Sequence, residues 1–142
     1  MRRMKLAIRS LFFDEGGSGE RIESSTEAEL TASFAGVTLR YADEENGMGK
    51  TELFIKSGTP CVVKMKNSAT EMSFSVGETH RSLYRVEELG EFDLAVTATR
   101  VESDITEEKG GTLRLDYESV LGGARRRTVM TLVAVPTGED AK

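Results

Sequence analysis

The sequence predicts an all-β fold, a single antiparallel up-and-down barrel of about 8–10 strands. Apolar residues recur at every second position through most of the chain, which is the period of a half-buried strand. Turn residues separate these runs at a spacing of roughly ten residues, and no helical segment long enough for a crossover lies between them. Closure into a barrel removes the exposed edges that so many strands would otherwise present.

The stretch 91–135 shows the alternation most clearly and reads as three consecutive strands. The Gly122-Gly123 pair supplies the positive φ that a two-residue hairpin turn requires. The register that follows from this turn places Leu115 opposite Met130 on the inner face. The inward residues expected of the first two strands are Phe92, Leu94, Val96, Ala98, Leu113, Leu115 and Tyr117.

The preceding part of the chain shows the same pattern in shorter runs. The run 21–34 also tolerates a helix, and we favour a strand only for its later part, from Ala28. Asn46-Gly47 is the strongest hairpin signal, and the segment 102–111 is expected to form a loop or one helical turn. The predicted strands cover residues 5–13, 28–34, 37–41, 51–56, 61–66, 72–76 and 80–86.

The totals fit one domain over residues 1–142, with a disordered tail predicted at 136–142. A hydrophobic content of 38%, a charged content of 30% and the lack of an apolar run of about 18 residues exclude a spanning helix. Arg9 interrupts the N-terminal apolar run, so no export signal is expected. Cys61 is the only cysteine, which excludes an intrachain disulfide and fits a reducing cytoplasm.

Three motifs built of turn glycines and alternating core residues stand out in the second half of the chain. They are Met72-x-Phe74-x-x-Gly77, Leu89-Gly90-Glu91-Phe92-Asp93-Leu94 followed by Thr97-x-Thr99, and Gly110-Gly111-x-Leu113-x-Leu115-x-Tyr117. The chain resembles, over nearly its whole length, the YwiB-like bacterial proteins, a domain family of unknown function with a calycin-like β-barrel. This resemblance implies the barrel fold and a bacterial cytoplasmic setting, and it implies no catalytic residues.

Candidate catalytic and metal-ligating residues are few. His80 is the only histidine, so neither a metal centre of several histidines nor a Ser-His-Asp triad can form within one chain. Cys61 lies on an apolar face without an adjacent activator, which favours a structural role. The acidic groups at 43–45, 87–88 and 104–108 fall in predicted turns and lack the EF-hand pattern, which leaves a weak divalent-cation site as the minor alternative. We expect no cofactor and assign no catalytic residue.

The sharpest charge feature is the triplet Arg125-Arg126-Arg127. Alternate residues of a strand point to opposite faces, so Arg125 and Arg127 share one side and Arg126 points to the other. Glu118 is expected opposite Arg127, so a cross-strand ion pair would give this arginine a structural role. Arg125 and Arg127 are the candidate anion-binding residues, whereas the net charge of −5 and the lack of interleaved aromatic residues argue against nucleic acid.

The barrel interior is the other candidate site, because barrels of this size are either filled by their own side chains or hold one small ligand. The leading hypothesis is a non-enzymatic binding protein for a small, mainly apolar molecule or a protein partner, with self-association left open. The alternatives are an enzyme that uses carboxylates and tyrosine at the barrel mouth, and an interaction module that uses the arginine strand. The candidate ligand-lining residues are Tyr41, Phe74, Phe92, Leu115, Tyr117 and Met130.

Overall fold

The structure, a computed structural model, describes residues 1–43, 49–56, 58 and 60–137. Within these residues the chain forms ten strands and no helix, which confirms the all-β prediction. The Asn46-Gly47 turn and the tail residues 138–142 lie outside the described residues. The strands are β1 (Arg2–Asp14), β2 (Gly19–Ser33), β3 (Gly36–Asp43), β4 (Gly49–Lys56), β5 (Val62–Lys66), β6 (Glu71–Phe74), β7 (Thr79–Val86), β8 (Gly90–Ser103), β9 (Gly111–Leu121) and β10 (Ala124–Pro136).

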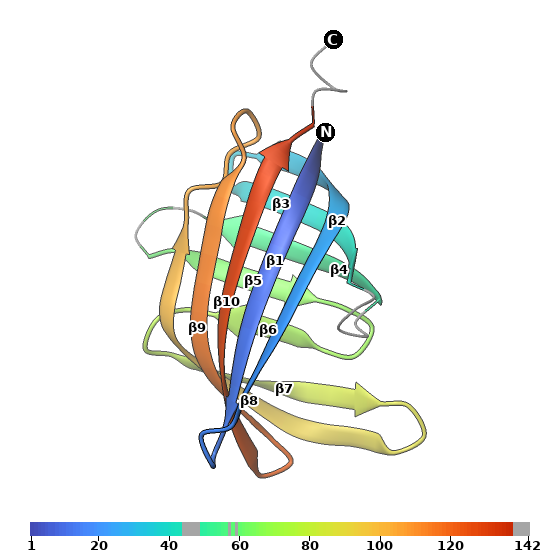
Figure 1. The fold of residues 1–142 in the computed structure, drawn as a ribbon, viewed down its shortest axis with the longest axis vertical. Helices are drawn as coiled ribbons and strands as arrows, with labels where there is room; N and C mark the ends of the chain where they lie inside the picture. The colour runs from blue at the N-terminus through green and yellow to red at the C-terminus, as the bar shows by residue number, and fades with distance from the viewer. Residues whose placement is uncertain (44–48, 57, 59, 138–142) are drawn as a thin grey trace.

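The strands form one antiparallel sheet in the order β6-β5-β4-β3-β2-β1-β10-β9-β8-β7. Neighbours in the sheet are also neighbours in the sequence, except where the first strand pairs with the last. Figure 1 shows this pairing of β1 with β10 along the front of the molecule. The predicted up-and-down arrangement is therefore confirmed, with the chain ends meeting in the middle of the sheet.

The sheet closes almost completely where its two edge strands meet. Past the end of β6, the backbone N–H of Gly77 donates to the carbonyl of Ala98 on β8 at 3.0 Å. The N–H of Arg85 on β7 donates to the carbonyl of Ala69, just before β6, at 2.8 Å. These bonds satisfy backbone groups that open edges would leave exposed, so the sheet forms a nearly closed barrel.

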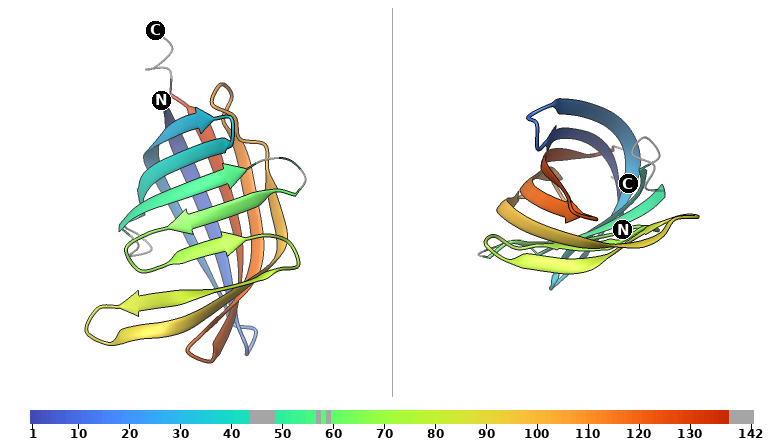
Figure 2. Two further views of the ribbon diagram at one scale, coloured as in Figure 1. Left: turned by 180° about the vertical axis from the view of Figure 1, so that it is seen from behind. Right: turned by 90° about the horizontal axis from the view of Figure 1, so that it is seen from below.

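Two sets of strands cross in this barrel (Figures 1 and 2). The strands β1, β2, β9 and β10 and the later part of β8 run along the long axis, and β3 to β6 cross behind them. We call the end at which the β1–β2 and β9–β10 hairpins turn the lower end, and the end that carries the termini the upper end. The β7–β8 hairpin projects to one side of the lower end.

The predicted register of the last hairpin is confirmed. Leu121 pairs with Ala124, and Leu115 faces Met130. Burying an aliphatic or aromatic side chain of this size contributes about 1.5–3 kcal/mol, so the inward residues dominate the stability of the fold. The largest fully buried side chains are Phe74, Met4, Leu6, Leu30, Leu39, Leu53, Ile55, Leu113, Leu115, Leu132, Val63 and Val96.

Most strand boundaries differ by a few residues from those expected from the sequence, and three of the differences change an assignment. β2 begins at Gly19, so the segment 21–27 is strand throughout, because β1 pairs with it along this length. β6 ends at Phe74, and Val76 lies beyond it with 59% of its surface exposed. Pro136 is the last residue of β10 and not the start of a disordered tail.

The segment 102–111 contains the end of β8 and, as expected, a loop. An antiparallel bridge between Thr106 and Gly110 closes the loop. Gly110 has φ +69°, and a Cβ atom there would lie 2.1 Å from the backbone oxygen of Ala134. Only glycine fits this conformation and this close approach, which gives the Gly-Gly motif a structural role.

Opposite charges alternate along the outer face of the barrel. Glu29 on β2 lies between Arg3 on β1 and Arg40 on β3 in the register. Arg40 also pairs with Glu52 on β4, with its Nε 3.0 Å from Oε2. Such cross-strand pairs favour the correct register, although each exposed pair adds less than about 1 kcal/mol. The complete row across the sheet is Arg3, Glu29, Arg40, Glu52, Lys66 and Glu71.

Candidate functional site

The interior of the barrel changes from apolar to polar toward its lower end. The register places Phe12 of β1 opposite Thr128 of β10, and Thr128 opposite Tyr117 of β9. One pair further down, Arg126 lies opposite Ser119. Because alternate residues share a face, all of these side chains lie on the inward side. We define the lower mouth by the six inward residues Ser10, Phe12, Tyr117, Ser119, Arg126 and Thr128.

Tyr117 connects the lower mouth to the apolar core. Its side chain is buried, and its ring centroid lies 4.7 Å from that of Phe74 at an interplanar angle of 54°. Burial raises the pKa of the Tyr117 phenol, while the Thr128 hydroxyl and the positive charge of Arg126 act in the opposite direction. The phenol is therefore neutral at physiological pH and is a hydrogen-bond donor inside the barrel.

Thr128 is the most deeply buried polar residue of the lower mouth, with 1% of its surface exposed. Its hydroxyl is close enough to favour the ionised form of Tyr117. Yet no group among the described residues meets hydrogen-bond geometry with the Thr128 oxygen. Buried hydroxyls normally have a partner, and the nearest candidate for Thr128 is the Tyr117 phenol, with which it forms no hydrogen bond of good geometry.

Arg126 enters the lower mouth from β10. Its guanidinium carbon lies 4.4 Å from the centroid of the Phe12 ring, a distance typical of a cation–π contact. It lies on the side of β10 that strand alternation predicts for the middle residue of the arginine triplet, and its side chain is exposed at the opening. Within the described residues, no carboxylate forms an ion pair with Arg126. Its charge is therefore available at the opening.

The two predicted anion-binding residues, Arg125 and Arg127, lie on the outer face and are both paired. Arg125 Nη1 lies 2.7 Å from Glu118 Oε1. Arg127 makes two hydrogen bonds to Asp116, at 3.0 Å from Nε to Oδ1 and 2.6 Å from Nη2 to Oδ2. The hydrogen bonds from Arg127 hold the pKa of Asp116 below its usual value. Arg127 does face Glu118 in the register as predicted, but the ion pairs form diagonally.

The predicted ligand-lining residues divide into two groups. Five of the six are buried in the core: Tyr41, Phe74, Leu115, Tyr117 and Met130. Phe92 is 36% exposed, because it belongs to the part of β8 that continues with the β7–β8 hairpin past the end of the barrel. A Cβ atom at Gly122 would lie 3.6 Å from the Phe92 ring, which places this ring beside the β9–β10 turn at the lower end.

The inner face of lower β2 is partly accessible to solvent. β3 pairs with β2 only over residues 28–33, so the half of β2 nearest the lower end has a strand on one side alone. Ser24 and Thr26 on this half point inward and are half-buried, whereas Leu30 further up is fully buried. Solvent therefore reaches the inner face of β2 near the lower end.

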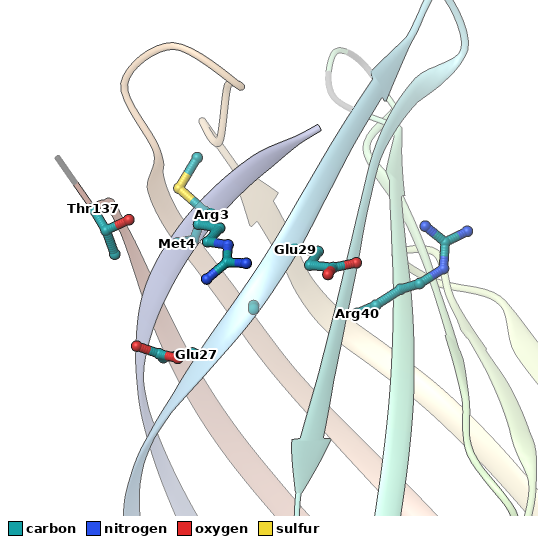
Figure 3. A pocket seen from close by; sticks show the side chains of 7 residues that line it. Arg3, Met4, Glu27, Glu29, Arg40 and Thr137 are labelled. Atoms are coloured by element: carbon teal, nitrogen blue, oxygen red, sulfur yellow. The ribbon is translucent and has the colours of Figure 1, made fainter. Parts of the chain in front are cut away.

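Several depressions lie at or near the outer surface, and their lining residues differ from the six residues of the lower mouth. One, with a volume of about 310 Å³, lies over β1, β2 and β3, where Figure 3 shows Glu29 between Arg3 and Arg40. Three of its four charged residues, Arg3, Glu29 and Arg40, belong to the alternating row described above. The fourth, Glu27, lies opposite Lys5. Another, of about 600 Å³, lies at the seam of the barrel and includes Cys61 and Glu102. Burial raises the pKa of the Cys61 thiol, which disfavours the nucleophilic thiolate.

The remaining candidates for chemistry do not come together. His80 Nε2 lies 3.6 Å from Glu78 Oε2 near the barrel seam. Among the residues that the structure describes, no three His, Cys, Asp or Glu side chains are placed to hold a metal ion. No helix in the described ranges has the length and hydrophobicity needed to span a bilayer.

Fold and site together define an antiparallel up-and-down β-barrel with a packed upper interior and a polar lower mouth. A family model described as "Domain of unknown function (DUF1934)" matches residues 7–128, and the chain belongs to this family. The crystal structure of the ywiB protein from Bacillus subtilis is similar in fold, with a TM-score of 0.74 and 22% identity, and the match covers 93% of this chain and 91% of that chain. These findings confirm the expected YwiB-like family. No curated protein matches the chain.

Sequence motifs do not reveal the inward polar residues. Ser10, Ser119 and Thr128 belong to no motif, and Arg126 was placed on the opposite face from its neighbours without a role. A signal is nevertheless present, because each of these residues occupies an inward position in a series whose other members are mostly apolar.

Proposed function

We propose that this protein is a non-enzymatic binding protein for a small, mainly apolar molecule and that it takes this molecule at the lower mouth. The observation that carries the proposal is the buried Thr128 hydroxyl, which meets hydrogen-bond geometry with no described group although it lies beside the neutral phenol of Tyr117. A polar atom of a ligand placed there satisfies both groups. The apolar part of the ligand contacts the partly exposed rim described below.

The enzyme alternative has less support. Catalysis by carboxylates and tyrosine requires these groups to converge on one cleft. Asp116 and Glu118 flank Tyr117 in the sequence, but strand alternation puts them outside the barrel, where arginines pair with them. The same pairs argue against an anion or nucleic-acid site at Arg125 and Arg127, because their charges are already matched.

The setting that supports this function is a bacterial cytoplasm. The sequence contains a single cysteine, and Cys61 has no partner for a disulfide within the chain. The solved structure of similar fold comes from Bacillus subtilis, and this source supports the bacterial part of the proposal. The calycin-like relationship implied by the sequence motifs stays a prediction.

A ligand screen with two matched variants tests the proposal. Decanol, decanoate and related ten-carbon amphiphiles are titrated below their aggregation limits, with thermal unfolding and native mass spectrometry as readouts. Thr128→Val removes the buried hydroxyl and keeps the shape of the side chain, and Thr131→Val makes the same change on the outer face of β10. We expect at least one amphiphile to raise the unfolding temperature of the wild type and of Thr131→Val, and to raise that of Thr128→Val less.

Two outcomes contradict the proposal. One is a wild-type protein whose unfolding temperature is unchanged by every amphiphile and that shows no bound species by native mass spectrometry. The other is an equal response of Thr128→Val and wild type, which moves any binding away from the lower mouth.

A further inference from the structure

The charge of Arg126 lies exposed over the lower mouth, beside the Phe12 ring, and from it we infer that the ligand of the lower mouth carries a carboxylate. This inference rests on the proposed function and adds the chemical class of the ligand head group. The ligand class is an amphiphile with one carboxylate and an apolar chain.

The three consecutive arginines of β10 have different surroundings. Arg125 and Arg127 are held by Glu118 and Asp116 on the outer face. Arg126 forms no ion pair with any described carboxylate and contacts the Phe12 ring instead. The aromatic contact holds the guanidinium at the opening but does not neutralise its charge, so its hydrogen-bond donors stay available for an oxygen acid.

The charge of Arg126 acts on the interior of the lower mouth. It favours the ionised form of Tyr117, although burial dominates and keeps the phenol neutral. An anion between Arg126 and Tyr117 receives charge-assisted hydrogen bonds from the guanidinium and a further one from the phenol. The Thr128 hydroxyl is a third donor on the same wall. This set of donors matches the two oxygens of a carboxylate.

The rim around Arg126 supplies the surface for an apolar chain. Phe12, Ile22 and Leu121 point inward at the lower end and are half-buried, so each keeps an apolar area in contact with water. Phe92 lies beside the β9–β10 turn with 36% of its surface exposed. Covering this rim with an alkyl chain removes apolar surface from water at about 25 cal/mol per Å².

The net charge of the chain does not favour the binding of anions, so anion binding needs a local cause. At −5 the protein as a whole repels anions, and its outer arginines alternate with carboxylates. A preference for an anionic ligand therefore has to come from a local, unpaired cation. Within the described residues, Arg126 is a cation of this kind that also faces the interior.

The test compares decanoate with decanol, which have the same chain length and differ in head-group charge. Binding is measured by isothermal titration calorimetry at constant ionic strength for the wild type, Arg126→Gln, Arg126→Lys and the outer-face control Arg125→Gln. We expect the wild type and Arg125→Gln to bind decanoate about tenfold or more tightly than decanol. We expect Arg126→Gln to bind the two compounds equally, and Arg126→Lys to keep part of the preference.

The outcomes separate this inference from the function on which it rests. Equal wild-type affinity for both compounds overturns the carboxylate inference and leaves the binding function standing. Binding of neither compound overturns both. A preference for decanoate that persists in Arg126→Gln and is lost in Arg125→Gln also overturns the inference, because it assigns the anion to the outer face.

Discussion

The upper and lower halves of the barrel interior are built by the same long strands but contain different residues. Following β1 downward, the inward side chains change from Met4 and Leu6 to Ser10, and along β10 they change from Leu132 to Thr128. The upper set is fully buried in contact with the core, whereas polar groups and half-buried side chains gather at the bottom. Strand alternation thus determines which side chains face inward. Whether these side chains are polar or apolar determines whether that part of the interior packs shut or has groups that could bind a ligand.

The largest expected effect comes from placing a charge in the upper interior. Leu115 is 1% exposed, and Leu115→Asp puts a carboxylate in the core without a partner. We expect a loss of several kcal/mol in the free energy of unfolding, measured by urea denaturation. Arg114→Asp, one residue away on the outer face, should cost far less. Equal losses for the two variants would contradict the assigned faces.

The two aromatic residues Phe74 and Phe92 sharpen the comparison between core and rim. Phe74→Ala leaves a cavity at a fully buried site and should cost about 3–5 kcal/mol. Phe92→Ala removes a ring that is already 36% exposed and should cost markedly less. Chemical denaturation of both variants measures the difference. A larger loss for Phe92→Ala would place this residue in the core after all.

A reciprocal pair of substitutions on β10 tests whether the two halves of the interior tolerate opposite chemistry. Leu132→Thr puts a hydroxyl into the apolar upper interior and should cost about 2–4 kcal/mol. Thr128→Val removes a hydroxyl that lacks a hydrogen bond of good geometry and should be neutral or stabilise by up to about 1 kcal/mol. Strong destabilisation by Thr128→Val would show that the chain itself uses this hydroxyl.

The smallest effect concerns the outer face, where Arg127 lowers the pKa of Asp116 in the folded protein. Below a pH of about 4 the unfolded chain takes up this proton before the folded one does. The stabilisation is therefore present above that pH and is lost as the pH falls through the lower, folded value. Arg127→Gln should flatten the pH dependence of the unfolding free energy in this acidic range. An unchanged profile would show that the pair does not affect stability.

Much of the fold could be predicted because it follows from period-two patterns and turn residues. The register of the last hairpin was fixed by its glycine pair, and Leu115 and Tyr117 face inward as expected. Segment 21–27 was harder, because its far edge is unpaired and polar residues are tolerated on both faces. The position of Phe92 depends on how far a hairpin extends past the barrel, which no local pattern encodes.

The candidate site could be predicted only in part. Tyr117 was named from its alternation, but its role depends on Thr128 and Arg126, which become its neighbours only through pairing with β10. The inward direction of Arg126 followed from its sequence position between two other arginines. Its lack of an ion pair did not, because this depends on where Asp116 and Glu118 place their side chains.

Titration of isotope-labelled protein with decanoate, followed by backbone amide chemical shifts, tests the lower mouth as the binding site most directly. The largest shifts are expected at Tyr117, Ser119, Arg126 and Thr128, with little change at the packed residues Leu39 and Leu53. Shifts centred on the outer depression around Arg3, Glu29 and Arg40, or on the upper interior, would contradict it.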